Sequence, residues 1–147
     1  MALRAYQELA IAQVREALEV YFRALLVMPT GSGKTIVFAR ICRLASDKGR
    51  KVLILVHRRE LVKQASDKLT KAGVEHGIIA AGFKPSAHPV QIASVQTLAR
   101  RLRTVSIEPD LIIIDEAHHA VAGQWEKILQ HFGNARVIGV TATPSRL

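Results

Sequence analysis

Short apolar runs alternate along the chain with stretches in which apolar residues recur every three or four positions. Uninterrupted apolar runs of this length are typical of strands that are buried on both faces of a sheet. The runs predict five strands, over 24–28, 51–56, 90–94, 110–114 and 136–140, with a weaker sixth candidate at 77–80. The periodic stretches between them predict helices.

Each predicted helix has one apolar face. In the first helix that face consists of Ala10, Val14, Ala17, Leu18 and Tyr21. Three more helices are predicted from about 34 to 48, from about 59 to 73, and through Trp125, Ile128, Leu129 and Phe132. Strands and helices that alternate on this scale form βαβ units. The predicted fold class is therefore α/β, an open, mainly parallel sheet with helices on both faces. No linker-like segment divides residues 1–147, so we expect a single domain.

Composition narrows the class of protein. Hydrophobic residues make up 49% of the 147 residues but aromatic residues only 5%, so Ala, Val, Ile and Leu must form the core. The lone Cys42 excludes a disulfide framework and any cysteine-based metal site within this chain. Cys42 and Trp125 both lie on apolar helix faces, which favours core positions for them. No apolar run reaches the length of a membrane span, so we expect a cytoplasmic chain without a membrane partner.

The charge points to a polyanionic partner. Lys and Arg number 21 against 12 Asp and Glu, which gives 21 − 12 = +9 and a sequence pI of about 10.3. Basic side chains that neutralise phosphates gain free energy by releasing counterions. Nucleic acid is the partner class that this balance favours, although solubility alone also accounts for a basic chain.

The segment that follows the first predicted strand, here called its strand exit, has the composition of a phosphate-binding loop. The segment consists of Pro29, Thr30, Gly31, Ser32, Gly33, Lys34 and Thr35, and a helical pattern follows it. Glycines at 31 and 33 let backbone N–H groups approach a triphosphate at the start of a helix. Lys34 would then reach the β- and γ-phosphates of ATP, and the Thr35 hydroxyl would bind Mg²⁺.

Two adjacent carboxylates follow the predicted strand 110–114. Asp115 and Glu116 would repel each other at its carboxyl end unless a cation or a function held them. In a nucleotide site Asp115 fits as the Mg²⁺ partner, and Glu116 as the group that polarises the attacking water. His118 and His119 lack the i, i+4 spacing of a zinc helix. We therefore expect Lys34, Thr35, Asp115 and Glu116 to converge.

Asp115-Glu116-Ala117-His118 after a phosphate loop resembles the DEAH form of motif II in superfamily-two helicases and translocases. Other segments are similar to motifs of that family, in the same order along the chain. They are residues 3–7 (the glutamine element), 28–35 (motif I), 57–61 (motif Ia), 92–98 (around motif Ib) and 141–144 (motif III). The similarity is greatest to the branch with restriction-enzyme motor subunits and repair helicases. It implies a three-layer RecA-like P-loop NTPase domain and favours DNA over RNA.

The resemblance also implies roles for single residues. Gln7 would bond the adenine edge of ATP, and Arg4 of the same glutamine element would also bind the nucleotide. Arg58, Arg59 and Thr97 would touch the sugar–phosphate backbone. Thr141, Thr143 and His118 would couple the nucleotide state to the nucleic-acid track. Read without the resemblance, Arg58 and Arg59 are equally well explained as solvated charges at the start of a helix.

In the family a second RecA-like domain follows and carries an arginine finger, which contributes about 10³–10⁵ in rate in P-loop enzymes. Nothing after position 144 of this chain can supply that arginine. We therefore expect the 147 residues to bind ATP with Mg²⁺ weakly, to hydrolyse ATP poorly and not to unwind a duplex.

Two other functions compete with the helicase or translocase hypothesis. A P-loop kinase or metabolic NTPase accounts for Lys34 and Asp115, but leaves Glu116, residues 141–144 and the basic excess unexplained. A non-catalytic nucleic-acid-binding module accounts for the charge. A Glu116→Gln substitution separates the hypotheses, because a motor loses hydrolysis while a pure binding module is unaffected. The cluster at Arg100, Arg101 and Arg103 fits phosphate contacts and a solvated helix end equally well.

Overall fold

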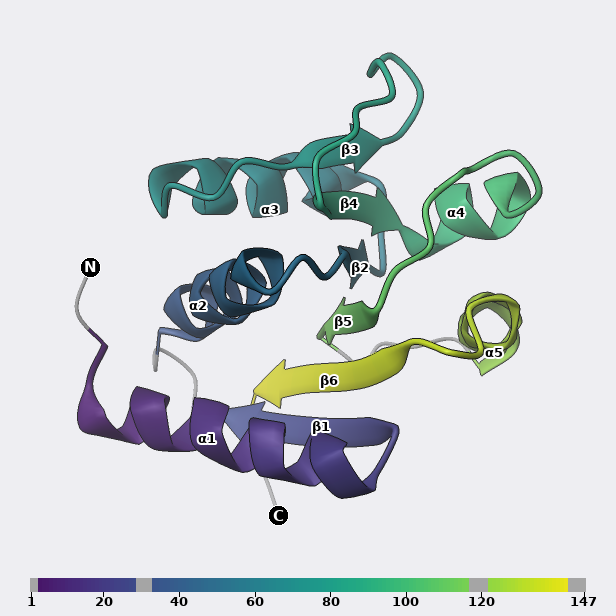
Figure 1. Ribbon diagram of the computed structural model, residues 1–147. Coiled ribbons are helices and arrows are strands. Elements are labelled where there is room, and N and C mark those ends of the chain that lie inside the picture. Colours follow the sequence, from purple (N-terminus) through teal and green to yellow (C-terminus); the bar gives the residue numbers. More distant parts are fainter. Residues whose placement is uncertain (1–2, 29–32, 117–121, 143–147) are drawn as a thin grey trace.

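The apolar runs of the sequence form one parallel sheet of six strands among the described residues (Figure 1). The computed structural model describes residues 3–28, 33–116 and 122–142. The strands are β1 (Arg23–Met28), β2 (Val52–Val56), β3 (Gly77–Ile79), β4 (Val90–Ser94), β5 (Leu111–Asp115) and β6 (Arg136–Ala142). They lie in the order β1-β6-β5-β2-β4-β3, and β3 confirms the weaker strand candidate.

Helices cover both faces of the sheet, which confirms the predicted three-layer architecture (Figure 1). On one face lie α1 (Ala5–Val20), α2 (Lys34–Asp47) and α3 (Glu60–Lys71). On the other lie α4 (Val95–Arg101) and α5 (Ala122–His131). Alternate residues of the central strand β2 enter different cores, Ile54 the first, Leu53 and Leu55 the second. This two-sided burial explains why β2, with the sequence VLILV, is apolar at every position.

The first helix is shorter than its predicted apolar face. The chain leaves the helix at Tyr21, which is extended at φ −116° and ψ 149° and is 64% exposed. Placing Tyr21 on the core face was therefore wrong, because the apolar spacing continues one residue beyond the last helical turn. The rest of the predicted face agrees better with the structure, since Val14 is buried with Gln7 and Ile11, and Ala10 and Leu18 pack against the same core.

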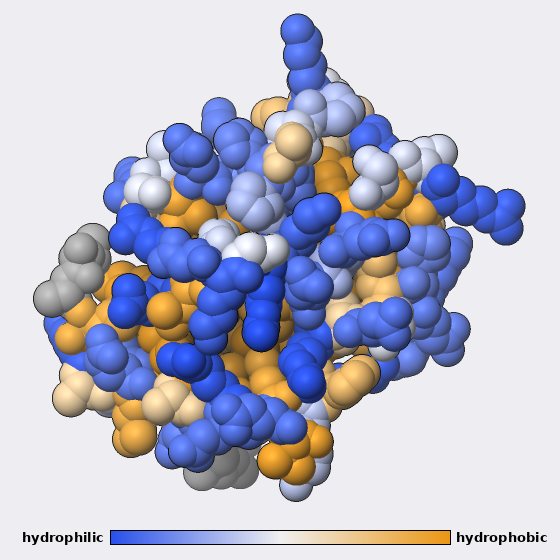
Figure 2. Space-filling view, viewed as in Figure 1, coloured by the Kyte–Doolittle hydropathy of each residue, from blue (hydrophilic) through white to orange (hydrophobic). Residues whose placement is uncertain are grey.

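The single cysteine and the single tryptophan both lie in the core, as expected. Cys42 is fully buried, and this burial raises the pKa of its thiol to about 12, so it carries no reactive thiolate. Trp125 is 4% exposed and packs in the α4–α5 core. Figure 2 shows hydrophilic side chains over most of one face, with apolar residues visible between them. Among the described residues no helix has the length and hydropathy that crossing a membrane requires.

Candidate nucleotide-binding site

The two predicted strand exits lie at the same edge of the sheet, with one strand between them. β6 is hydrogen-bonded to β1 on one side and to β5 on the other. Met28 at the end of β1 is opposite Ala142, and Asp115 at the end of β5 is opposite Val140. The carboxyl ends of parallel strands are where open α/β sheets bind ligands.

Lys34 joins the two exits. It is the first residue of α2, and its Nζ lies 3.1 Å from Asp115 Oδ1. The same ammonium donates a hydrogen bond to the Glu116 carboxylate. All three side chains are about a quarter exposed, so they form a partly buried ionic cluster. The structure thus brings together residues that lie 81 and 82 positions apart in sequence, as the site prediction requires.

The electrostatics of this cluster keep Lys34 charged. Partial burial by itself lowers the pKa of the ammonium, because the charged form loses hydration. The hydrogen bond to Glu116 and the negative charge of Asp115 oppose this effect, and the net result is a Lys34 pKa above its ordinary value of 10.5. One lysine therefore offsets the repulsion between two neighbouring carboxylates.

A cavity of about 190 Å³ opens beside the cluster, and the predicted metal ligand Thr35 lines it with Lys34, Asp115 and Glu116. Sequence reasoning missed Gln64 and Lys68, which line the same cavity from α3. Both lie on the helix face that carries Leu61, Ala65 and Leu69, a face that the apolar spacing does identify. Their position follows from the strand order, because β2 lies beside β5 and the helix that follows β2 then borders the site.

The residues at this edge fit a Mg²⁺ ion bound with phosphates. Asp115 Oδ1 is buried and accepts no hydrogen bond from the described residues, although the Lys34 ammonium lies near it. A desolvated carboxylate oxygen of this kind suits a hard cation. The described residues contain no group of three or more His, Cys, Asp or Glu side chains that would enclose a metal ion. Mg²⁺ characteristically takes one or two carboxylates from a protein and completes its shell with water and phosphate oxygens.

Gln7 holds the end of the phosphate-loop segment. Its side chain is 2% exposed, its Oε1 accepts a hydrogen bond from the Arg4 amide at 2.9 Å, and its Nε2 donates to the Gly33 carbonyl at 3.5 Å. Gly33 has φ +79°, a conformation that side chains disfavour, and a Cβ there would meet Gln7 Nε2. The adenine contact of Gln7 stays a prediction, while its contact with Gly33 is a role that the sequence did not indicate.

Glu116 has a strained backbone. Its φ is +53°, and it is the one non-glycine residue with positive φ in the described ranges 3–28, 33–116 and 122–142. Such residues cost on the order of 1–3 kcal/mol and cluster at functional sites, where surrounding contacts hold them. The turn after β5 therefore directs the Glu116 carboxylate toward Lys34 at some conformational expense.

The residues predicted to contact nucleic acid differ in exposure. Arg58 and Arg59 are exposed just before α3, at the carboxyl end of β2. Thr97 is only 6% exposed inside α4, so its predicted backbone contact has little surface available. Thr141 lies on β6, one residue beyond the partner of Asp115. The other predicted site residues lie outside the described residues: Pro29, Thr30, Gly31, Ser32, His118 and Thr143.

Known proteins share this chain's sequence and fold. It is 39% identical to IRC3 of Saccharomyces cerevisiae, over 98% of the chain and 24% of that protein. It is 30% identical to the DNA 3'-5' translocase XPB2 of Sulfurisphaera tokodaii, over 98% of the chain and 31% of that protein. The chain thus spans about a quarter to a third of these relatives. The solved UvsW helicase from bacteriophage T4 has the same fold, with a TM-score of 0.79 over 97% of this chain and 52% of its own, at 20% identity.

The sequence of one known protein family matches nearly the whole length of this chain. Residues 1–146 match the family described as "Type III restriction enzyme, res subunit". This match and the relatives above confirm the resemblance to superfamily-two helicases and the RecA-like fold that it implies. The chain belongs to this restriction-enzyme res-subunit family and is a helicase-type ATPase domain of superfamily two.

Proposed function

We propose that the chain is the first of two RecA-like motor domains in an ATP-dependent translocase or helicase that acts on DNA. The observation that carries the proposal is the meeting of Lys34 with Asp115 and Glu116 across two separate strand exits. The DNA 3'-5' translocase among the relatives favours DNA as the track. The exposed Arg58 and Arg59 lie at the same edge of the sheet and would contact its phosphates.

In this proposal Lys34 exchanges partners when ATP binds. The ammonium that now neutralises two carboxylates would move to the β- and γ-phosphates, where its charge stabilises the negative charge of the transferred group. Glu116 would then accept a hydrogen bond from the water that attacks the γ-phosphorus. The water oxygen would form a bond to the γ-phosphorus while one of its protons passes to the Glu116 carboxylate. The bond from that phosphorus to the β–γ bridging oxygen would break, ADP would leave with the electron pair, and the transferred group would become inorganic phosphate.

Asp115 and Thr35 are the residues that would hold Mg²⁺. The ion supplies neutralisation of phosphate charge when it is bound. Gln7 would contact adenine from the start of α1, and its bond to Gly33 would transmit the presence of the base to the phosphate loop. Thr141 with Thr143 and His118 would link this site to the nucleic-acid track.

We further propose slow turnover by these 147 residues alone. The described lining of the cavity includes Lys34 and Lys68 but no arginine. A second domain would supply the arginine finger, whose absence in P-loop enzymes lowers the rate by about 10³–10⁵.

The test compares Lys34→Ala and Glu116→Gln with Lys48→Ala, which removes an exposed lysine just beyond α2. Binding of a fluorescent ATP analogue with Mg²⁺ and steady-state hydrolysis are measured for each protein. We expect Lys34→Ala to lose binding, and Glu116→Gln to keep binding but lose about 10²–10⁴ of the wild-type turnover. Lys48→Ala should match the wild type in both assays.

Two outcomes would contradict the proposal. Equal nucleotide affinity in Lys34→Ala and the wild type would mean that the cavity is not a phosphate site. Wild-type turnover in Glu116→Gln would remove the motor mechanism. Thermal melting of each variant separates a loss of binding from a loss of folding.

A further inference from the structure

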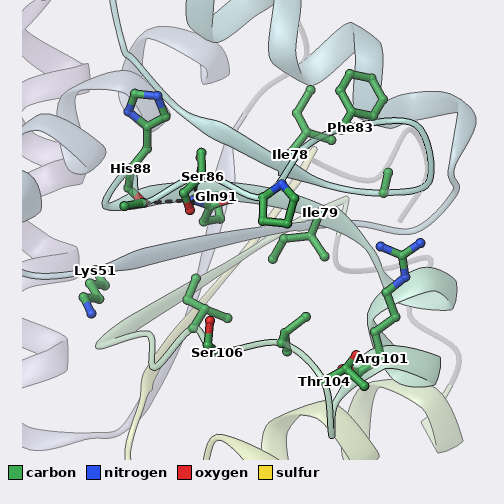
Figure 3. A pocket seen from close by; sticks show the side chains of 15 residues that line it. Lys51, Ile78, Ile79, Phe83, Ser86, His88, Gln91, Arg101, Thr104 and Ser106 are labelled. Carbon is green, nitrogen blue, oxygen red and sulfur yellow. Dashed lines mark hydrogen bonds between the residues drawn. The ribbon is translucent and has the colours of Figure 1, made fainter.

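A second cavity among the described residues lies away from the nucleotide site. Its volume is about 670 Å³, and it lies beside the edge strand β3, between the segment 80–88 and the segment 101–107 (Figure 3). Lys51 and His88, which precede β2 and β4, place it near the amino ends of those strands. The nucleotide cavity lies at the opposite, carboxyl ends.

The upper wall of this cavity is held in place by Gln91 (Figure 3). Gln91 is 5% exposed, and its Nε2 donates to the Ser86 carbonyl at 3.1 Å, to Ser86 Oγ at 3.2 Å and to the His88 carbonyl at 3.0 Å. A Cβ on Gly77 would meet both Ser86 Oγ and the Gln91 amide, so the close approach depends on glycine. The wall is therefore a built feature, since a buried side chain fixes the backbone of an otherwise exposed segment.

All ionisable side chains in the lining are basic: Lys51, His88 and Arg101. None of the three forms an ion pair with another described residue. Lys51 and Arg101 lie on opposite sides of the cavity (Figure 3). The sequence contains no acidic residue between Glu75 and Glu108, and this interval also contains the exposed Lys84, Arg100 and Arg103. The charged side chains of the lining are thus all basic, while the carboxylate of Asp110 accepts a hydrogen bond from the Lys51 backbone amide at 2.8 Å at one end of the cavity. A lining of one sign favours a polyanion.

The remaining lining suits a chain of nucleotides better than a point anion. Ser86, Thr104 and Ser106 bring hydroxyl groups, and Phe83, 51% exposed, offers an aromatic surface beside Ile78 and Ile79. Cations on two sides of a cavity match a ligand with repeated phosphates, whereas a single phosphate would engage only one side. Basic grooves with an exposed aromatic residue bind single strands by phosphate contacts and base stacking.

We propose that this cavity binds a short stretch of single-stranded nucleic acid, with Lys51 and Arg101 contacting phosphates and Phe83 stacking on a base. The inference rests on the proposed function only in the class of partner. The surface is separate from the predicted contacts of Arg58 and Arg59, so it would hold a second part of the strand or a displaced strand.

The test measures the affinity of the chain for fluorescent oligothymidylate and oligouridylate over a range of salt concentrations. The double variant Lys51→Glu/Arg101→Glu is compared with Arg15→Glu/Lys127→Glu, which makes the same charge change at exposed positions on α1 and α5. We expect the first double variant to bind at least about tenfold more weakly and to lose about 1.4 from the salt slope, at about 0.7 per phosphate on a single strand. Phe83→Ala, which changes no charge, should weaken binding by about fivefold or more.

Selective labelling adds a readout that does not depend on charge. Because Cys42 is fully buried, Ser86→Cys places the one accessible thiol at the wall of the cavity. Bound oligonucleotide should slow its reaction with a maleimide severalfold. Both oligonucleotides protecting the thiol equally would indicate phosphodiester recognition, and protection by one alone would identify DNA or RNA as the ligand.

Several results would overturn the inference. Equal weakening by the two double variants would show a general charge effect, as would an unprotected thiol at position 86. If only Arg58→Glu/Arg59→Glu weakens oligonucleotide binding, the nucleic-acid contact of the proposed function is supported and the second binding surface proposed here is wrong. If the wild type binds no oligonucleotide, the nucleic-acid partner of both proposals is wrong, while nucleotide binding is still decided by Lys34→Ala.

Discussion

The cavities at the two ends of the sheet differ in how their charged side chains are paired. At the carboxyl ends, Lys34 is paired with Asp115 and Glu116, so an incoming phosphate must displace carboxylates from the ammonium. At the amino ends, Lys51, His88 and Arg101 face no acidic side chain in the cavity lining. A site that balances its charges is suited to switching with the bound ligand, whereas a site of one sign is suited to holding a polyanion.

At each end of the sheet a buried glutamine side chain lies close to a glycine. Gln7 contacts Gly33 at the nucleotide end, and Gln91 contacts the segment beside Gly77 at the other end. The two glycines differ in one respect, because Gly33 has φ +79° while Gly77 is not among the residues with positive φ. Alanine substitutions at Gly33 and Gly77 therefore test the two ends of the sheet one at a time. They also distinguish a glycine required by its backbone conformation from one required by the close approach of a side chain.

Gly33→Ala should have the largest effect on stability. The left-handed backbone costs an alanine about 1–2 kcal/mol, and the new Cβ would push the Gln7 amide away from its partners, which costs about 1 kcal/mol more. We expect a loss of about 2–3 kcal/mol in the free energy of urea unfolding and weakened binding of the ATP analogue, with oligonucleotide binding at the amino end unchanged.

Two further variants separate the backbone part of this loss of stability from the part due to the Gln7 side chain. Gly49→Ala has a similar φ of +74° and no atom within 4 Å of the new Cβ, so it should show the backbone part alone. In a Gln7→Ala background, Gly33→Ala should lose only that same part. A full 2–3 kcal/mol loss in the Gln7→Ala background would contradict the contact between the two residues.

How far the sequence predicts this fold depends on where each element buries its side chains. The strands predicted at 90–94 and 136–140 were predictable because both faces of each strand are largely buried, so most of their positions are apolar. The end of α1 was not, since Tyr21 continues the apolar spacing after the chain has become extended. Helix α4, with seven residues, is too short for its period to define it.

The candidate site was predictable in its chemistry but not in its surroundings. Lys34, Asp115 and Glu116 follow from two local patterns and the rule that parallel strands share a ligand-binding edge. Gln64 and Lys68 were missed because their position depends on which strand lies beside β5, and no local pattern encodes strand order. The wall held by Gln91 was missed for a similar reason, since a glutamine inside an apolar strand gives no sign of which loop it will bond.

Gly77→Ala should have the next largest effect, confined to the amino end. Its Cβ would displace the Gln91 amide from Ser86 and His88, and the loss of these hydrogen bonds should cost about 1–2 kcal/mol without a backbone penalty. We expect weaker oligonucleotide binding, measured by fluorescence anisotropy, and unchanged affinity for the ATP analogue. Weakened nucleotide binding in Gly77→Ala but not in Gly33→Ala would reverse the assignment of the two ends.

The smallest expected effect concerns pH and tests the charge balance at the carboxyl end. The pKa of Lys34 is raised above 10.5 in the folded state because the carboxylates outweigh its desolvation, so folding favours the protonated form. The stabilisation is therefore fully present below the unfolded pKa of 10.5 and is lost as pH rises through the higher folded value. Urea unfolding of the wild type and Lys34→Met, from about pH 8 to about pH 11.5, should show a stability difference that shrinks at the alkaline end.

Lys48→Met is the matched control, because Lys48 is exposed beyond the end of α2 and should show no such trend. The proteins differ only at the substituted lysine, so the difference in stability between Lys34→Met and the wild type reports on position 34. A stability difference that grows with pH would mean that desolvation by burial outweighs the attraction of the two carboxylates, so that folding lowers the pKa of Lys34. The carboxyl end would then lack the charge balance that distinguishes it from the amino end, and the exchange of partners proposed for Lys34 would lose its basis.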